Sequence, residues 1–322
     1  MGDLQKLATM TPFSALASWK KSSLLLFLFA LCSVFSAHAT DGIYTQFGLD
    51  LGYAGRIGYM GGTTPHWAIF TYGAGTASSP FTALDISAPP GTLFPQIDGN
   101  IAMAGVYSNL TISGRGSING DRYEQTTSTE TVSGNAVLAG TRHSSASINS
   151  QLNGGITSLK NVSNSAALLS PTAGSPSTIN MGGGTNTIFD NTAFGGKYVM
   201  RLTDLVLSGG STLTLNGAAG TAFVLNISRN FNIGGASRIL LSGGLTPSDV
   251  LFNVRGNSGA QFEITGDSIF NGTLLAYNSG SGGQRTLSIS GHNTMTNGEL
   301  IANKVVVSSG AKVKHPKKKS EE

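Results

Sequence analysis

The chain has 322 residues and a formal net charge of +4; 44 residues are glycine, about twice the usual share, and only 11% are charged. A hydrophobic fraction of 39% excludes a disordered chain, which would be highly charged and poor in large apolar residues. The glycines keep no three-residue period, which excludes collagen. This composition is typical of many short strands separated by tight turns.

Residues 1–39 have the pattern of an export signal. Two lysines precede an apolar run at 24–37, which is shorter than the about 20 residues that span a bilayer. The small-x-small sequence that ends at Ala39 predicts cleavage before Thr40. An uncleaved signal anchor is the alternative, and translation starts at the first methionine or at Met10. We therefore expect a secreted, extracellular or cell-surface bacterial protein.

The mature chain contains no cysteine, because Cys32 lies inside the leader. It can form neither a disulfide nor a thiolate metal site, and nothing in the sequence indicates a cofactor. Between residues 40 and 310 there are 12 basic and 13 acidic residues. This balance gives no reason to expect nucleic acid as a partner, and no membrane insertion is expected after cleavage.

The first mature segment, residues 41–62, is rich in glycine and tyrosine. It precedes every copy of the repeat described next. Because an open solenoid end must be sealed, we interpret this segment as a lead-in or a cap.

A five-residue pattern recurs along the chain: an apolar residue, any residue, a second apolar residue, a small polar residue and glycine. Its copies begin at Leu110, Leu205, Leu213, Ile239, Phe262 and Leu287. Two longer phrases also return after 26 or 27 residues: 222–230 as 249–257, and 271–276 as 297–302. Each unit supplies two short strands, and glycine at the corner permits the positive φ that a bend needs.

Units of about 25 residues cannot cover their own apolar faces, but stacked units bury one another. The sequence therefore predicts an all-β fold, a right-handed parallel β-helix spanning residues 40–310. Asn226 and Asn253, one unit apart, are placed to stack as a polar ladder. A β-sandwich whose turns look alike is the alternative.

One stretch interrupts this rhythm, because its apolar residues are spaced by four, four, three and three: Ile148, Leu152, Ile156, Leu159 and Val162. Gly154 and Gly155 weaken a helix here by roughly 1 kcal/mol each. The spacing predicts an amphipathic α-helix over about 145–169, packed along the flank of the solenoid. After it and the later repeats, residues 311–322 form a basic tail, which we expect to be disordered.

The order of these parts resembles the bacterial choice-of-anchor A group of secreted, adhesive or collagen-binding-like domains. The resemblance rests on residues 66–73 and 97–114, the helical insert and the phrases that follow it up to about residue 315. More distantly, the chain is similar to bacterial ice-binding proteins, whose β-solenoid carries a long helix along one side. The chain lacks an apolar anchor after Val307, which favours a freely secreted product.

Catalytic and metal-ligating residues are not identified by the sequence. Glycoside hydrolysis needs two carboxylates about 5–10 Å apart, and the nearest sets are Asp121 with Glu124 and Glu263 with Asp267. Glu263 alternates with apolar neighbours and is expected to face solvent. The mature histidines are far apart in sequence and form no metal motif: His66, His143, His292 and His315. His292 is interpreted as a turn residue.

Ice binding would require a flat, wide face of threonine and small residues. Thr-x-Thr phrases begin at Thr185, Thr212 and Thr294, which is too few for an array. The outward positions of the pentamers are mixed: Thr214, Leu240, Glu263 and Ser288.

The sequence therefore favours a non-catalytic, secreted protein of the adhesion type. It would recognise a surface, matrix polymer, envelope component or ice through a flat solenoid face, by residues that the sequence does not single out. Ice binding and a polysaccharide lyase or hydrolase on a β-helix are the alternatives, and a structural biofilm component stays open.

Overall fold

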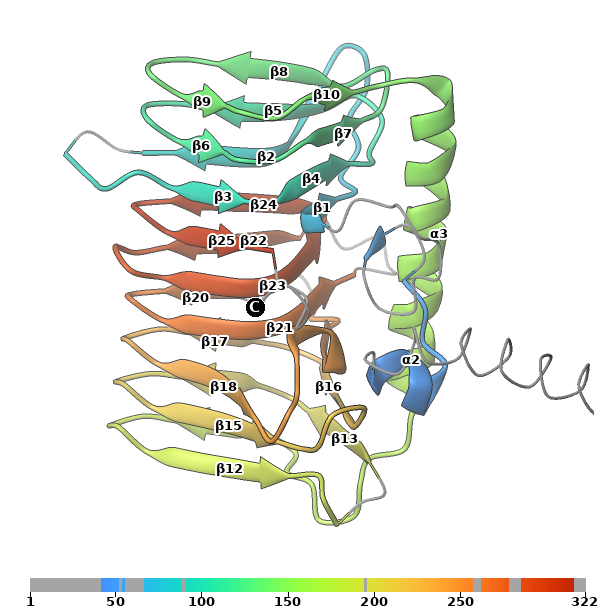
Figure 1. The fold of residues 1–322 in the computed structure, drawn as a ribbon, viewed down its shortest axis with the longest axis vertical. Coiled ribbons are helices and arrows are strands. Elements are labelled where there is room, and N and C mark those ends of the chain that lie inside the picture. The colour runs from blue at the N-terminus through green and yellow to red at the C-terminus, as the bar shows by residue number, and fades with distance from the viewer. Residues whose placement is uncertain are drawn as a thin grey trace, which may run out of the picture. The chain divides into compact units, whose positions relative to one another are not determined.

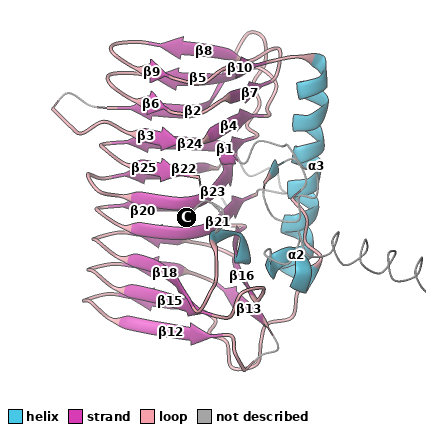
Figure 2. Cartoon of the chain, in the orientation of Figure 1, coloured by secondary structure: helices cyan, strands magenta, loops and turns pink. Residues whose placement is uncertain are grey.

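The computed structural model describes residues 42–51, 54–55, 67–88, 91–193, 196–256, 262–277 and 285–315. The leader with its cleavage site at Ala39 and Thr40, His66, and residues 316–322 lie outside the described residues. Residues 41–322 form one compact unit. Its parallel strands coil into a three-faced β-solenoid, and one long helix runs along the flank (Figures 1 and 2).

The first face is a nine-stranded parallel sheet. In spatial order its strands are β11 (Ile179–Met181), β14 (Leu205–Leu207), β17 (Phe231–Ile233), β20 (Phe262–Thr265), β22 (Thr286–Ser290), β24 (Lys304–Ser308), β2 (Phe81–Ser87), β5 (Ser108–Ile112) and β8 (Thr129–Val132). Four of the six pentamers lie in this sheet, in β5, β14, β20 and β22. They stack in register one above another, as a solenoid requires.

A sixteen-stranded parallel sheet bends to form the other two faces. The face that follows the nine-stranded sheet along each coil contains β12 (Asn186–Asp190), β15 (Thr212–Asn216), β18 (Arg238–Ser242), the start of β21 (Ile269–Ala276), the start of β23 (Met295–Ala302), β25 (Lys312–Lys314), β3 (Gln96–Asp98), β6 (Ser117–Ile118) and β9 (Val137–Leu138). The third face contains β13 (Lys197–Leu202), β16 (Ala222–Ile227), β19 (Val250–Val254), the ends of β21 and β23, β1 (Trp67–Thr71), β4 (Asn100–Met103), β7 (Arg122–Glu124) and β10 (Arg142–His143).

Each complete coil thus carries three strand positions, and the expectation of two strands per unit is wrong. In β21 and β23 the second and third positions fuse into one bent strand of eight residues. The bend falls at Gly272 and Gly298, whose φ angles are 144° and 152°.

The coils are not stacked in chain order. β1 pairs with β23, and the chain then builds the coils that end at β10. The helix α3 (Ala146–Leu168) carries it along the solenoid to β11 at the opposite end (Figure 1). From there the coils return to the middle, where β24 pairs with β2 and β25 pairs with β3. One coil is therefore assembled from β24, β25 and β1, from both parts of the chain.

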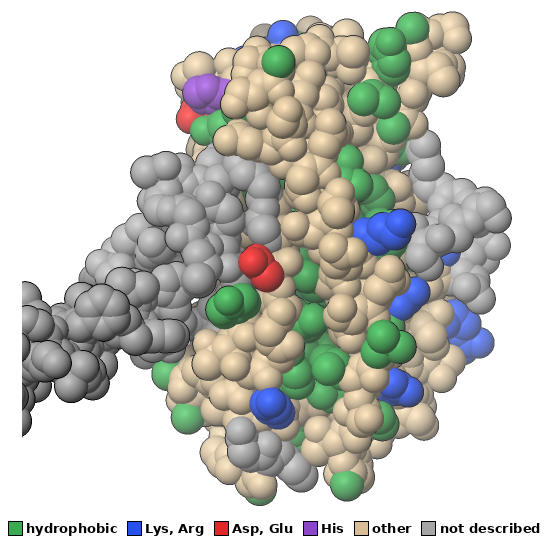
Figure 3. Space-filling view, turned by 90° about the vertical axis from the view of Figure 1, so that its right-hand side faces the viewer, with side chains coloured by type: hydrophobic (Ala, Val, Ile, Leu, Met, Phe, Trp, Pro, Cys, Tyr) green, Lys and Arg blue, Asp and Glu red, His purple; other side chains and the backbone are tan. Residues whose placement is uncertain are grey.

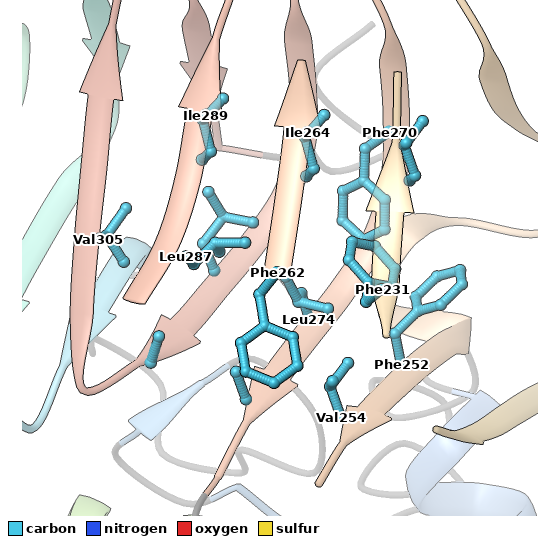
Figure 4. Close-up of a cluster of buried hydrophobic side chains, with 14 of the residues drawn as sticks. Phe231, Phe252, Val254, Phe262, Ile264, Phe270, Leu274, Leu287, Ile289 and Val305 are labelled. Atoms are coloured by element: carbon cyan, nitrogen blue, oxygen red, sulfur yellow. The ribbon is translucent and has the colours of Figure 1, made fainter. Parts of the chain in front are cut away.

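The apolar residues of the pentamers point into the solenoid. Phe231 and Phe252 come from one coil and Phe270 from the next, with ring centroids 5.1–5.9 Å apart. Figure 4 shows them together with Ile264, Leu274 and Leu287. Burying each such side chain contributes about 1.5–3 kcal/mol. This interior confirms the parallel β-helix and excludes the sandwich.

The corners after the nine-stranded sheet are made by glycine. Gly209 and Gly266 have φ angles of 59° and 62°, as expected for the last residue of a pentamer. These corners also stack closely, because a Cβ built on Gly235 would lie 2.9 Å from the backbone nitrogen of Gly209. Glycine is needed there for the turn and for the spacing between coils.

Two boundaries expected from the sequence are corrected by the structure. The described part of the lead-in segment is not a cap: it includes the short helix α2 (Gly42–Phe47), which packs beside β16, β19 and the turn η2 (Pro247–Asp249). The tail does not begin at residue 311, because β25 is a strand and Val313 is fully buried. Val313 alternates with the lysines on either side of it and points into the solenoid, so this basic segment still forms a strand of the repeat.

Candidate functional site

The third face cannot serve as a broad docking surface, because α3 and the described residues 42–51 and 54–55 cover it; we call it the covered face. Leu152, Leu159 and Val162 of α3 are buried against the solenoid. Figure 3 looks onto this flank and shows scattered Lys and Arg side chains on its outer surface. The amphipathic helix predicted along the flank is confirmed.

The expected asparagine ladder lies beneath this helix. The side-chain amide of Asn253 donates to Asn226 Oδ1 at 2.8 Å and to the carbonyl oxygen of Ser163 at 2.9 Å. Asn226 in turn donates to the carbonyl oxygen of Ala166 at 2.7 Å. Side-chain amides thus fix the register of α3 on the solenoid, where buried polar groups must be paired. The ladder is structural and does not face solvent.

The nine-stranded sheet is exposed and rich in hydroxyl groups; we call it the hydroxyl face. One column of outward residues follows six consecutive coils. Thr265, Ser290, Ser308 and Ser87 are paired in the sheet, and Ser113 and Ser133 continue the column directly after β5 and β8. Parallel strands place successive members about 4.8 Å apart. A hydroxyl both donates and accepts hydrogen bonds, so this column presents water with a regular line of water-like groups.

A second column runs beside the first along the centre of the hydroxyl face. Its members are Asn180, Val206, Asn232, Glu263, Ser288, Val306, Asp85, Thr111 and Thr131. At one end of the face, Asn109 donates to Thr111 Oγ1 at 3.1 Å and accepts from Thr129 Oγ1 at 3.0 Å. These bonds hold the threonine side chains in one orientation. In the pentamers of the hydroxyl face, the small polar residue that follows the second apolar residue falls in the first column, and this position was the sequence signal for the face.

The remaining exposed face, which begins with β12 and ends with β9, is chemically irregular; we call it the mixed face. Its first outward column contains Asn186, Thr212, Arg238, Ile269, Met295, Lys312, Gln96, Ser117 and Val137. Polar, cationic and large apolar side chains alternate there without a period. Such a surface offers no repeated arrangement of donors and acceptors.

The Thr-x-Thr phrases do not mark a face. Thr212 and Thr214 point outward on the mixed face, whereas Thr294 and Thr296 are fully buried. Thr187, in the first phrase, faces the interior beside Leu213. The four outward positions compared in the sequence also belong to two faces. Thr214 pairs with Leu240 on the mixed face, while Glu263 pairs with Ser288 on the hydroxyl face.

The candidate carboxylates are not arranged for hydrolysis. Asp121 lies 3.2 Å from His143 Nε2 and accepts the backbone N–H of Thr141, which lowers its pKa. Glu124 instead points into the last coils and binds Arg142 at 2.9 Å. Asp121 and Glu124 therefore make contacts with different partners.

Glu124 belongs to a charged layer that closes the solenoid interior at this end. Arg122 binds Glu130 at 2.7 Å, and Glu124 and Glu130 share a hydrogen bond. Burial, and then the hydrogen bond and charge of Glu130, raise the pKa of Glu124 to about 8. Glu124 thus keeps its proton at neutral pH, whereas the pKa of the neighbouring Glu130 is lowered. The layer replaces the cap expected from residues 41–62.

The other candidate residues are separated. Glu263 is half-buried and outward, between inward Phe262 and Ile264, as expected. Asp267 sits at a corner with a φ of 65° and accepts the backbone N–H of Asn293 at 3.0 Å. His292 is exposed in the next corner. Among the described residues, no group of three His, Cys, Asp or Glu side chains could hold a metal ion.

An open cavity of about 440 Å³ lies at the end of α3. Among its described lining residues are Arg201 and Arg255, and none of them is acidic. Arg201 donates to the carbonyl oxygens of Leu169 and Ala167 at 3.1 and 3.2 Å. The guanidinium thereby supplies hydrogen-bond donors to carbonyl groups at the end of α3, whose last turn carries no basic residue of its own.

Comparisons with known proteins agree on one family. A family profile described as Ice-binding-like matches residues 85–313. Among solved structures, an ice-binding protein from an Antarctic biological consortium is 18% identical, with a TM-score of 0.50, and the match covers 84% of this chain and 91% of that one. An ice-binding protein from an Arctic yeast is 14% identical, with a TM-score of 0.49 and coverage of 78% and 91%.

No curated protein matches the sequence. The matches support the more distant resemblance, to ice-binding β-solenoids, and not the choice-of-anchor A group. The long helix beside the solenoid is shared with this fold. Among the helices of the described residues, none is both long and apolar enough to span a membrane.

Proposed function

Because the chain belongs to the Ice-binding-like family, we propose that it is a non-catalytic, exported protein that binds ice through the hydroxyl face. The observation that carries this proposal is the unbroken Ser and Thr column over six coils. Its repeat of about 4.8 Å is close to a lattice repeat of ice. This function replaces adhesion as the favoured interpretation.

The chemistry of the face supports the same proposal. A preordered sheet loses little conformational entropy when it meets a solid surface. Hydroxyl groups can hold water in positions that continue the ice lattice, because each donates and accepts. The covered face is occupied by α3, and the mixed face lacks a repeat, so neither presents an equivalent pattern.

The proposal is tested with the exported protein. Its intact mass checks that the mature chain begins at Thr40. Thermal hysteresis and inhibition of ice recrystallisation are then measured for the unaltered protein and for two tyrosine variants. Thr111→Tyr places a bulky ring in the central column of the hydroxyl face, one coil from its end, and Thr214→Tyr is the matched change on the mixed face. We expect Thr111→Tyr to lose most activity and Thr214→Tyr to keep it.

If Thr214→Tyr loses the activity and Thr111→Tyr keeps it, the mixed face binds ice instead of the hydroxyl face. Absence of hysteresis and of recrystallisation inhibition in the unaltered protein would refute the proposed function. Binding to a matrix polymer without any effect on ice would then restore the adhesive interpretation. Cleavage of a glycan by the pure protein would establish the enzymatic alternative.

A further inference from the structure

The hydroxyl face contains a charged side chain within the part where Ser and Thr are most frequent. Asp85 lies on β2 in the central column, between Thr111 on one neighbouring strand and Val306 on the other. Ser87, two residues later, belongs to the unbroken hydroxyl column. Asp85 thus occupies the middle of the five coils from β22 to β8, where Ser and Thr are densest.

Among the residues that the structure describes, none forms an ion pair with this carboxylate. The ion pairs among the described residues involve other acidic side chains. Lys304 lies two residues before Val306 and is therefore diagonal to Asp85, a position that a long side chain can reach on a sheet, but the structure forms no ion pair between these two described residues. Glu263, the other acid of the central column, lies on β20 beyond β22 and β24 and adds charge of the same sign. Asp85 consequently keeps its own hydration.

A carboxylate imposes a water arrangement that differs from the arrangement imposed by a hydroxyl. An ionised carboxylate only accepts hydrogen bonds, whereas Ser and Thr also donate. Every first-layer water at Asp85 must therefore turn a hydrogen toward the protein. Water in ice donates and accepts equally, and removing the hydration water from an ion is energetically costly. The lattice cannot continue across this position without that cost.

We infer that Asp85 limits the affinity of the hydroxyl face for ice and divides the face into two smaller patches. This inference rests on the proposed function and deepens it, because it names the residue that sets the strength of ice binding. A charge on an exposed sheet also opposes association between copies of the chain, which gives a physical reason for its presence.

The inference is tested by Asp85→Thr, which extends the pattern Thr131, Thr111 by one coil. The matched control is Asp98→Thr, the same change on β3 of the same coil, where the side chain points outward on the mixed face. At equal protein concentration we expect Asp85→Thr to raise thermal hysteresis about twofold or more. We expect Asp98→Thr to leave it unchanged.

Combining Asp85→Thr with Thr111→Tyr separates this inference from the proposed function. The double variant is expected to lose the gain, because both residues lie on one surface. Unchanged or lower hysteresis in a folded Asp85→Thr variant, while Thr111→Tyr still blocks the unaltered protein, would overturn the role of Asp85 alone. If neither the unaltered protein nor Asp85→Thr affects ice, both statements fail.

Discussion

Two adjacent glycines of α3 allow a direct test of how the helix packs on the solenoid. Gly154 is exposed, and a Cβ built on it would meet no atom within 4 Å. Gly155 is buried, and its Cβ would lie 3.1 Å from the backbone nitrogen of Ala54 and 3.1 Å from Cζ of Phe70. The sequence alone assigns both glycines the same cost to the helix, whereas the structure distinguishes them.

The expected changes in unfolding free energy have opposite signs. Gly154→Ala gains the full difference in helix propensity and should stabilise the protein by about 0.8–1 kcal/mol. Gly155→Ala gains the same propensity but must displace backbone and ring atoms, at about 1–3 kcal/mol for overpacking. The net effect of Gly155→Ala is then a loss of about 1 kcal/mol. Gly298→Ala is expected to lower the unfolding free energy most among the three glycine variants.

Gly298→Ala should destabilise by about 3 kcal/mol or more. Its φ is 152°, and its Cβ would lie 1.9 Å from the carbonyl oxygen of Gly272 on the next coil. Backbone strain of this kind costs about 1–3 kcal/mol, and the clash adds to it. Urea unfolding followed by circular dichroism measures all three variants. Equal shifts for Gly154→Ala and Gly155→Ala would refute the close contact of α3 with residue 54 and Phe70.

Two further predictions concern the charged layer and the last strand. Because the folded pKa of Glu124 is raised to about 8 from 4.5, the native state holds a proton that the unfolded chain releases, so stability should fall as pH rises from about 5 to 8. Glu124→Gln, which mimics the protonated form, should flatten this profile in urea titrations at several pH values; an unchanged slope would contradict the assignment. Ending the chain at Gly310 removes β25 and buried Val313. The free energy of unfolding should fall by several kcal/mol, since burial and ladder bonds are both lost, and the midpoint of thermal melting should fall with it. Ending it at His315 keeps both and should leave the midpoint unchanged, and equal midpoints for the two chains would show that β25 is dispensable.

The sequence could predict the features that depend on local order. The period of the pentamers indicated parallel coils, and the spacing of Leu152 and Leu159 indicated a helix on the flank; both are confirmed. The contact between Asn226 and Asn253 was also foreseen, because equal positions in consecutive repeats must meet in a solenoid. Their burial under α3 was not foreseen, since it depends on where the helix docks.

The candidate face was missed for a similar reason. The outward residues of the pentamers were compared as one set, although copies such as those at Leu213 and Phe262 lie on different faces. Ser87 and Ser133 lie outside any copy of the pentamer, so their place in the hydroxyl column could not be read from the repeat. Only the register between strands brings them into line with Thr265.

The sequence by itself determined the unit of construction, because alternation within a strand and glycine at a corner are decided by neighbouring residues. Only the tertiary structure decided the order in which units stack, the coil shared by β24, β25 and β1, and the face left open to solvent. These depend on which distant edges pair, and parallel strand edges offer the same backbone donors and acceptors to every partner. Side-chain packing across the coils and the length of α3 select one arrangement among the many that the repeat alone would permit.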